Sequence, residues 1–173
     1  ALSELYSFDS DTLMKEFNLS EKQVGSLKKS EKDLAKNAMM IEDMENRGFN
    51  LIEFLDEQQY PRLLKKNLGY KYCPSLIYAY GNIDLFNESS ISIVGSRSAS
   101  DTALIFTDNI AKIAVKEMKV VVSGFAKGVD RRSLDTAIEN HGRAIIVLPQ
   151  GILTAGKITK DYYTEINEGD VLV

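Results

Sequence analysis

The sequence predicts an α/β protein: a Rossmann-like, three-layer domain with a mostly parallel sheet, preceded by a small helical domain. From residue 90 onward, short β-branched apolar runs alternate with helical segments, which is typical of βαβ units. Several of the apolar runs lead into glycine-containing loops. The first 48 residues are polar, with apolar residues at helical spacing, which indicates a separate helical domain.

The N-terminal segment, residues 1–48, is expected to form three helices of the SAM or helix-hairpin type. Gly25 is expected to act as a turn or close-contact point, and Gly48 to end the last helix. No hydrophobic-Gly-hydrophobic-Gly turn is present, so a packing or interaction module is the favoured interpretation over DNA binding. The polar residues that can begin the three helices are Ser10–Asp11, Ser20–Glu21 and Ser30–Asp33.

Residues 49–173 are expected to form the Rossmann-like domain. The expected strands are Phe49–Ile52, Leu76–Gly81, Ile91–Val94, Val120–Ser123, Ala144–Leu148 and Asp170–Val173. The expected helices are Thr102–Lys116, Asp130–Asn140 and Tyr162–Ile166. Helical spacing predicts that the first of these helices packs through Ala103, Phe106, Ile110, Ile113 and Ala114.

The composition excludes several classes of protein. No apolar run reaches the roughly 18 residues that span a membrane, and the first residues do not form a secretory signal. The single cysteine, Cys73, cannot form an intrachain disulfide, which fits a cytoplasmic protein, and is expected to be a buried structural thiol. One cysteine and one histidine, His141, cannot form a zinc site of the usual type, so no metal or other cofactor is expected.

The net charge of −4 conceals a gradient along the chain. Residues 88–160 carry ten Lys or Arg and seven Asp or Glu, so this part has a local charge of +3 and the remainder −7. Phosphate binding responds to the local field, so the acidic total does not exclude a nucleic-acid partner.

The first glycine-containing loop, Gly95–Ser100, has the composition of an anion site. Gly95 allows a tight turn, Ser96 offers a hydroxyl, and the following helix begins with N–H groups that favour negative charge. Arg97 adds a guanidinium group that fits phosphate in a bidentate manner.

The second loop, Ser123–Gly128, continues into the basic start of a helix. Gly124 and Gly128 leave room for a ligand near the backbone, while Lys127, Arg131 and Arg132 supply positive charge. Phe125 can stack on a base or fill the core beneath the loop. Asp130 is expected to cap the helix that follows.

A third loop follows the strand at 144–148, with Gly151 near its start and no charge before Lys157. In an open parallel sheet, ligands collect beyond the carboxyl ends of the strands, where all three loops are expected. Neither basic loop has the spacing of a dinucleotide-binding fingerprint or a P-loop. The residues alone therefore predict a phosphate-binding α/β domain.

Taken in order, several short motifs resemble the DprA/Smf family of DNA-processing proteins. The resemblance covers roughly residues 48–173 and is strongest at Val122–Asp130, Val-Ser-Gly-Phe-Ala-Lys-Gly-Val-Asp. The other matching segments are Gly48–Ile52, Tyr60–Leu63, Pro74–Tyr78, Gly81–Asn82 and Ile93–Arg97.

The resemblance implies a Rossmann-like, non-enzymatic protein that binds single-stranded DNA with little sequence preference. It also implies protection of incoming DNA and loading of RecA during natural transformation, and formation of a homodimer. The family's phosphate-contacting segments fall on Gly95, Ser96, Arg97, Ser123, Gly124, Lys127 and Gly128.

The sequence departs from the family pattern at several positions. Leu134 stands where the family usually has a histidine, and Thr102-Ala103 where it has Tyr-Gly. The usual Tyr-Pro is missing around Ala155–Lys157, and the Arg-Asn-Arg segment of the second half of the domain is absent. These differences indicate a shortened or divergent member, or a chain truncated at its C-terminus.

Two other functions fit parts of the sequence. The second interpretation is a nucleotide-binding or nucleotide N-glycosidase-like Rossmann enzyme or sensor. Related Rossmann-like enzymes cleave nucleotide N-glycosidic bonds with a Pro-Gly-Gly-x-Gly-Thr segment followed by a glutamate. The comparable stretch here, Pro149–Thr154, lacks that pattern and is followed by no glutamate before Glu165. A helical adaptor that acts through residues 1–48 is the third interpretation.

Overall fold

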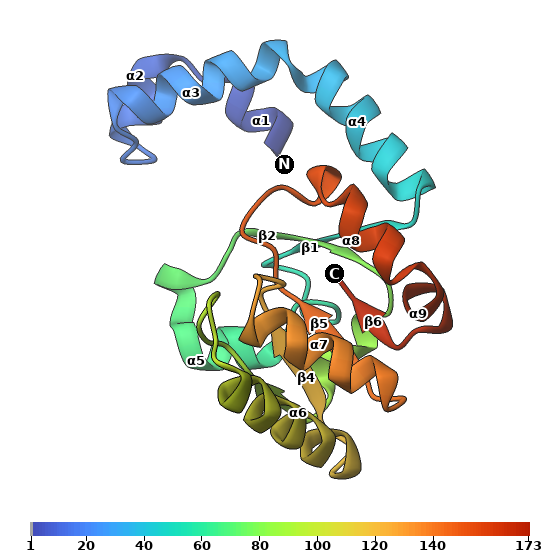
Figure 1. The fold of residues 1–173 in the computed structure, drawn as a ribbon. Coiled ribbons are helices and arrows are strands. Elements are labelled where there is room, and N and C mark those ends of the chain that lie inside the picture. Colours follow the sequence, from blue (N-terminus) through green and yellow to red (C-terminus); the bar gives the residue numbers. More distant parts are fainter. Residues whose placement is uncertain (1) are drawn as a thin grey trace. The chain divides into compact units, whose positions relative to one another are not determined.

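The computed structural model describes residues 2–173, except for the side chains of Leu2, Ser3, Lys157 and Thr159. The chain divides into two compact units, Ala1–Arg47 and Gly48–Val173 (Figure 1). No helix in the described part of the chain is long and apolar enough to cross a membrane.

The first unit is helical, as predicted. Asp9, not Ser10 or Asp11, caps the second helix, because its extended backbone lets the carboxylate accept the N–H of Thr12 at 2.8 Å. Ser20 caps the third helix in a capping box with Gln23, as predicted. The helices are α1 (Leu2–Ser7), α2 (Ser10–Lys15), α3 (Glu21–Lys32) and α4 (Leu34–Asn46).

A helix, α4, does follow the predicted segment Ser30–Asp33, but Asp33 and not Ser30 stands directly before its first residue. α3 continues to Lys32, and the Ser30 hydroxyl donates to the carbonyl of Leu27 within that helix. Gly25 lies inside α3 with nothing near the position of a Cβ atom, so it is neither a turn nor a close contact. Gly48 follows the end of α4 with a φ of +83°, as expected of a glycine that ends a helix.

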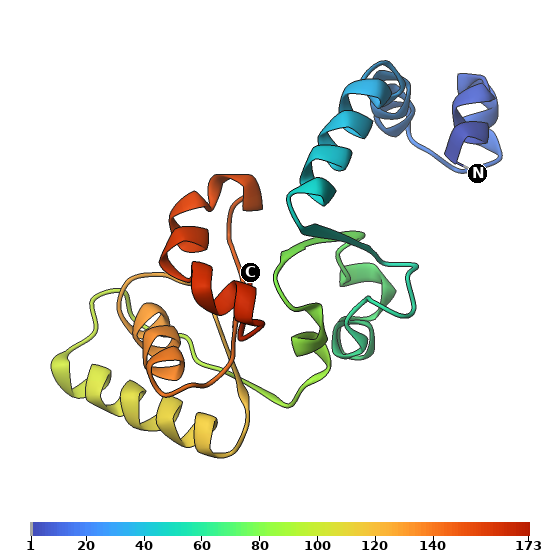
Figure 2. The same ribbon diagram turned by 90° about the vertical axis from the view of Figure 1, so that its right-hand side faces the viewer.

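The second unit contains a four-stranded parallel sheet in the order β3-β4-β5-β6, which confirms the Rossmann-like α/β prediction. Because neighbouring strands follow one another in the chain, α6 and α7 pack side by side on the same face of the sheet (Figure 2). The strands are β3 (Ser90–Ser92), β4 (Val120–Ser123), β5 (Ala144–Ile146) and β6 (Val171–Leu172). The connecting helices are α6 (Asp101–Lys116), α7 (Val129–Glu139), the 3-10 turn η2 (Ile152–Thr154), α8 (Gly156–Asp161) and α9 (Tyr163–Glu168).

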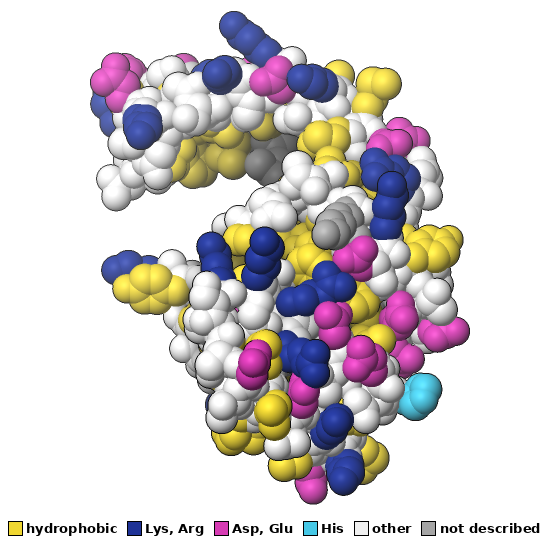
Figure 3. All heavy atoms as spheres, viewed as in Figure 1, with side chains coloured by type: hydrophobic (Ala, Val, Ile, Leu, Met, Phe, Trp, Pro, Cys, Tyr) yellow, Lys and Arg dark blue, Asp and Glu magenta, His cyan; other side chains and the backbone are white. Residues whose placement is uncertain are grey.

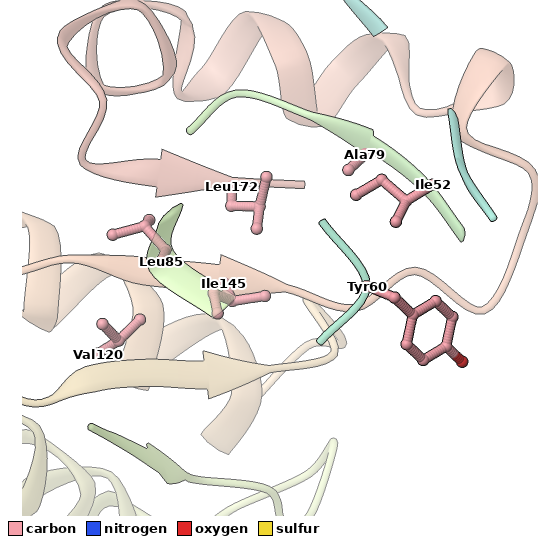
Figure 4. Packing of buried hydrophobic residues seen from close by; sticks show 7 residues of the cluster. All are labelled: Ile52, Tyr60, Ala79, Leu85, Val120, Ile145 and Leu172. Atoms are coloured by element: carbon pink, nitrogen blue, oxygen red, sulfur yellow. The ribbon is translucent and has the colours of Figure 1, made fainter. Parts of the chain in front are cut away.

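The opposite face of the sheet is covered by a hairpin with a short helix. The antiparallel strands β1 (Phe49–Glu53) and β2 (Leu76–Tyr80) flank α5 (Arg62–Tyr72), and the 3-10 turn η1 (Ile83–Asn87) leads to β3. Side chains from this layer and from three sheet strands form one core, in which each fully buried Leu or Ile contributes about 1.5–3 kcal/mol (Figure 4). Its buried members are Ile52, Tyr60, Ala79, Leu85, Val120, Ile145 and Leu172.

The predicted inner face of α6 was right for Ala114 but wrong for Phe106 and Ile113. Phe106 and Ile113 are 65% and 54% exposed, whereas Thr107, Ala111 and Ala114 are buried. Small side chains on this face let α6 approach α7 closely, and Asp108 of α6 then pairs with α7. The helical period was therefore predictable from the sequence. The residues that face α7 were not, because close packing of the two helices favours small side chains over large ones at their contact.

The hairpin is joined to the parallel sheet at Gly81. Tyr80 and Val173 exchange two backbone hydrogen bonds of 2.8 and 2.9 Å, and Gly81 forms an antiparallel bridge to Leu172. The φ of Gly81 is +115°, and a Cβ atom there would lie 2.4 Å from the Val171 carbonyl oxygen. Only glycine allows this approach without displacement of the backbone.

Substitution of Gly81 should therefore destabilise the second unit. We expect Gly81→Ala to lower the free energy of unfolding by about 2–4 kcal/mol, because it adds both backbone strain and a steric clash. Gly151→Ala is the control, since Gly151 has a φ of −59° and open space around it. Urea unfolding followed by circular dichroism measures both, and equal stability of the two variants would contradict the assigned role of Gly81.

The Asp108–Arg132 pair should make stability depend on pH. Two hydrogen bonds from Arg132, of 2.5 and 2.6 Å, lower the pKa of Asp108 below its ordinary value of 3.8. The stabilisation is thus present above that value and disappears as the pH falls through the folded-state pKa. We expect Asp108→Asn to cost about 1 kcal/mol at pH 7, because Arg132 is half exposed, and almost nothing at a pH below the folded-state pKa of Asp108.

A double-mutant cycle with Arg132→Gln provides the control. The double variant should be no less stable than Asp108→Asn alone, as measured by urea unfolding at both pH values. An Asp108→Asn penalty of the same size at both pH values would show that the ion pair does not stabilise the contact between α6 and α7.

Candidate nucleic-acid interface

Three loops meet beyond the carboxyl ends of β3, β4 and β5, where the sequence predicted a phosphate site. They enclose a hollow of about 640 Å³. The lining residues are Arg97, Gly124, Phe125, Ala126, Lys127, Asp130, Val147, Leu148, Pro149, Gln150 and Ile158. The topology thus brings together segments that lie up to sixty residues apart in the sequence.

The first two loops are locked together at a loop junction formed by Gly95, Ser96, Gly128, Val129 and Asp130. The Gly95 N–H donates to the Asp130 carboxylate at 3.0 Å, and the Val129 N–H donates to the Ser96 carbonyl at 3.1 Å. Gly128 has a φ of +82°, and a Cβ atom there would lie 2.1 Å from the Ser96 oxygen. A side chain at Gly128 would push the two loops apart.

Asp130 does not cap its own helix, contrary to the prediction. Gly128 occupies the position before α7, and the helix has no side-chain cap. The Asp130 side chain is buried and turned toward the first loop, where it accepts the Gly95 N–H. The other carboxylate oxygen would lie 3.0 Å from a Cβ atom at Gly124, so a side chain there would require the carboxylate to shift slightly.

The hydroxyl groups of the serines in the first two loops mainly form hydrogen bonds within the protein. Ser123 is buried, and its hydroxyl donates to the Ile93 carbonyl at 2.5 Å, so its side chain joins β4 to the end of β3. Ser100 caps α6 by accepting the N–H of Ala103. Ser96 accepts the Ser98 N–H at 3.1 Å, which leaves its own O–H able to donate to an anion.

The basic residues of the site fall into two groups. Arg97 and Lys127 are exposed at the hollow, and neither has an ion-pair partner among the described residues. Arg131 instead lies between Asp135 and Asp161, with N–O distances of 2.8 and 3.0 Å. Burial alone would lower the pKa of Arg131, but hydrogen bonds to the two carboxylates raise it, so its charge is compensated inside the protein.

Phe125 is half-buried, with part of its ring packed against the protein and part of it at the hollow. One side of its ring contacts Arg131, whose guanidinium carbon lies 4.5 Å from the ring centroid, and Tyr162, in an edge-to-face arrangement at 5.9 Å. The ring also lines the hollow. Its φ of +60° is rare for an aromatic residue, which indicates that the loop holds the ring in place at a cost in backbone strain.

Tyr162 contacts both Phe125 and Arg131 and is itself held by a hydrogen bond. Its hydroxyl donates to Asp135 at 2.6 Å, and burial, together with that carboxylate, raises the pKa of the phenol well above its usual value. Arg131, Asp135 and Tyr162 therefore form a closed network that supports Phe125 from the side away from the hollow.

Backbone N–H groups contribute to the second loop. Within the described residues, the N–H groups of Phe125, Ala126 and Lys127 have no hydrogen-bond acceptor. Consecutive N–H groups of this kind attract anions, and the positive end of the α7 dipole begins at the next turn. The loop can therefore bind a phosphate group through its backbone, with Lys127 beside it.

The third loop contributes more than the sequence suggested. β5 ends at Ile146, so Val147 and Leu148, expected in the strand, lie in the loop and line the hollow with Gln150. Ile158 of α8 also lines it, and only the fold could reveal that, since apolar spacing alone does not distinguish a lining residue from a core one. The side chain of Lys157 lies outside the described residues.

Two of the departures from the family pattern have clear places in the fold. Leu134 is fully buried, where an apolar side chain packs well, and Thr102 and Ala103 lie in the first turn of α6. Glu165 lines a different depression, beside Arg131 and Asp135, and does not reach the hollow. The described residues contain no group of His, Cys, Asp and Glu side chains arranged for a metal ion.

The comparisons with known proteins agree with this geometry. Residues 50–173 match the sequence model of the family described as DNA recombination-mediator protein A. The DNA processing protein DprA of Streptococcus pneumoniae is 33% identical over 79 residues, which is 46% of this chain and 28% of that protein. DprA of Bacillus subtilis is 30% identical over 106 residues, or 61% of this chain and 34% of that protein.

Solved structures show the same fold. The X-ray structure of S. pneumoniae DprA superposes with a TM-score of 0.59 at 22% identity, covering 99% of this chain and 55% of that one. A structure described as giving insights into the single-stranded DNA binding mode of Helicobacter pylori DNA processing protein A has a TM-score of 0.50 at 21% identity, covering 72% of this chain and 54% of that one. The chain thus spans about a third or less of these curated relatives and about half of the solved chains. Because the family match extends over residues 50–173, most of its length, this chain belongs to the DprA/Smf family.

Proposed function

We propose that the hollow at the carboxyl edge binds single-stranded DNA through its phosphates, with little preference for sequence. The observation that carries the proposal is a pair of exposed cations at the hollow, Arg97 of the first loop and Lys127 of the second, together with the unused backbone N–H groups of the second loop. All three groups favour phosphate, and none of them reads the edge of a base. Family membership supports DNA as the source of that phosphate.

The ring of Phe125 favours, as the ligand, a nucleic acid whose bases are accessible for stacking. Its ring lines the hollow beside the phosphate-binding groups, and aromatic rings stack on any base with little discrimination. A duplex hides the faces of its bases, whereas a single strand exposes them. The described binding of single-stranded DNA by the H. pylori relative is consistent with this choice.

The hollow is better suited to binding than to catalysis. Its ionisable lining groups among the described side chains are Arg97, Lys127 and Asp130. The carboxylate of Asp130 is already engaged by the Gly95 N–H and is buried beneath the loops. A nucleotide N-glycosidase would need an available carboxylate at the substrate, so we propose a non-enzymatic role.

The proposal includes the wider role implied by the family, in which the bound strand is protected and passed to RecA by a homodimer. Family membership supports this part. Of the phosphate-site residues predicted from the sequence, we assign direct contact to Gly124, Phe125, Lys127, Arg97 and Ser96. We assign a supporting role to the rest, namely Gly95, Ser123, Gly128 and Arg131.

Removal of either exposed cation should weaken binding to all sequences alike. We expect Arg97→Ala and Lys127→Ala each to reduce affinity for oligothymidine and for mixed-sequence oligonucleotides by a similar factor. Each should also reduce the slope of log affinity against log salt by about 0.7, because one phosphate contact is lost. Fluorescence anisotropy across a salt series measures both quantities.

Lys116→Ala is the matched control, because Lys116 is also exposed but lies in the last turn of α6, at the opposite edge of the sheet. It should bind as the unmodified chain does. Absence of oligothymidine binding at low salt would disprove the proposal. A large thermal stabilisation by a mononucleotide, without oligonucleotide binding, would favour a nucleotide enzyme or sensor.

Binding should also require the loop junction. Asp130→Ala removes the acceptor of the Gly95 N–H, so we expect about 1.5–3 kcal/mol of lost stability together with weaker DNA binding. Asp130→Asn keeps an oxygen acceptor and should retain most of both. Chemical unfolding and anisotropy on the same samples test this, and full DNA affinity in Asp130→Ala would show that the hollow does not depend on the junction.

A further inference from the structure

We propose a second contact site for single-stranded nucleic acid, formed by Lys66, Tyr70, Lys71 and Tyr72 of the C-terminal part of α5 and by Tyr78 of β2. This tyrosine–lysine surface would bind the continuation of a strand held in the hollow. The inference rests on the proposed function, and it adds a base-stacking site on the hairpin layer, outside the phosphate loops.

The tyrosines of this surface are unusually accessible. Tyr70 is 88% exposed, Tyr72 69% and Tyr78 44%. Gly69 interrupts α5 with a φ of +65° and a ψ of 171°, so the residues after it leave the helical path. A cluster of exposed aromatic rings has no role in the core and is typical of a binding surface.

The rings are supported from one side only. Tyr70 packs edge-to-face on Phe54, with centroids 5.2 Å apart, and the Lys71 ammonium lies 5.4 Å from the centroid of Tyr72. Lys65 in turn lies over Phe54 at 4.9 Å. The rings are therefore partly held in position while most of their surface faces solvent, as in the stacking platforms of single-strand binders.

The charge of the segment favours a polyanion. Residues 58–83 contain four Lys or Arg and no Asp or Glu, in a chain whose net charge is −4. Lys66 and Lys71 are exposed, and neither has an ion-pair partner within the described part of the chain. Exposed lysines interleaved with tyrosines match a backbone of phosphates that carries stackable bases.

A groove connects this surface to the hollow. It has a volume of about 300 Å³ and shares Val147, Leu148 and Gln150 with the lining of the hollow. The groove is also lined by Pro74, which follows Tyr72 by two residues in the chain, and by Tyr78 of β2. At the left of Figure 3, over the end of α5, a basic side chain lies beside a projecting hydrophobic one, and further basic side chains lie over the loops.

The experiment compares two lengths of fluorescently labelled oligothymidine, of about 6 and about 18 nucleotides, on the full chain by anisotropy. The short strand fills the hollow, whereas the long one also reaches α5. We expect Tyr70→Ala with Tyr72→Ala to weaken binding of the long strand by about fivefold or more per tyrosine and to leave the short strand unchanged. Tyr70→Phe with Tyr72→Phe should bind both lengths normally, because a phenyl ring also stacks.

Tyr163→Ala is the matched control, since Tyr163 on α9 is 62% exposed but has acidic neighbours. A second variant, Lys66→Glu with Lys71→Glu, tests the surface without removal of a ring and should also affect only the long strand. Circular dichroism confirms that each variant is folded.

Several results would overturn the inference. If the tyrosine and lysine variants bind the long strand normally while Lys127→Ala loses both lengths, the tyrosine–lysine surface is not a contact site, and the proposed function stands. Equal loss on both lengths would indicate a general disturbance of the hollow. If the unmodified chain binds neither length, the proposed function and this inference fail together.

Discussion

The candidate site depends on the junction between the first two loops. Gly128 lacks a Cβ atom at the point where the second loop crosses the Ser96 carbonyl, and the buried Asp130 carboxylate holds the Gly95 N–H. These contacts fix the ends of β3 and β4 relative to each other and to the start of α7. The exposed groups of both loops therefore have defined positions before any ligand arrives, which reduces the entropy cost of binding.

The ion pairs show which basic residues hold the fold together and which remain available to a ligand. Arg131, Arg132 and Arg143 pair with carboxylates that belong to other elements or to the next helical turn. These pairs connect α6 to α7, α7 to α8, and the residue before β5 to the segment before β3. Arg97 and Lys127 are not used in this way. A modest local excess of positive charge can thus be concentrated at one edge of the sheet, because most neighbouring arginines are already neutralised.

The hairpin layer covers the second face of the parallel sheet, which the topology of the sheet does not by itself require. Its core with β4, β5 and β6 covers the face of the sheet opposite α6 and α7, and the Gly81 bridge joins β2 to β6. The same packing places Pro74 and Tyr78 beside the third loop. Residues before the sheet in sequence and residues after β5 therefore border one continuous surface, although no local pattern relates them.

The sequence by itself determined the α/β class, the approximate positions of the strands, the helical spacing and the glycine, serine and basic composition of the loops, because these follow from local periodicity and backbone freedom. It also showed the family resemblance through short motifs. Tertiary structure alone decided that Asp130 joins two loops, that Ser123 and Arg131 support the site, and that Phe106 faces solvent. Each depends on which distant groups are close enough to pair or pack, and a single sequence records residue types and spacing but not those distances.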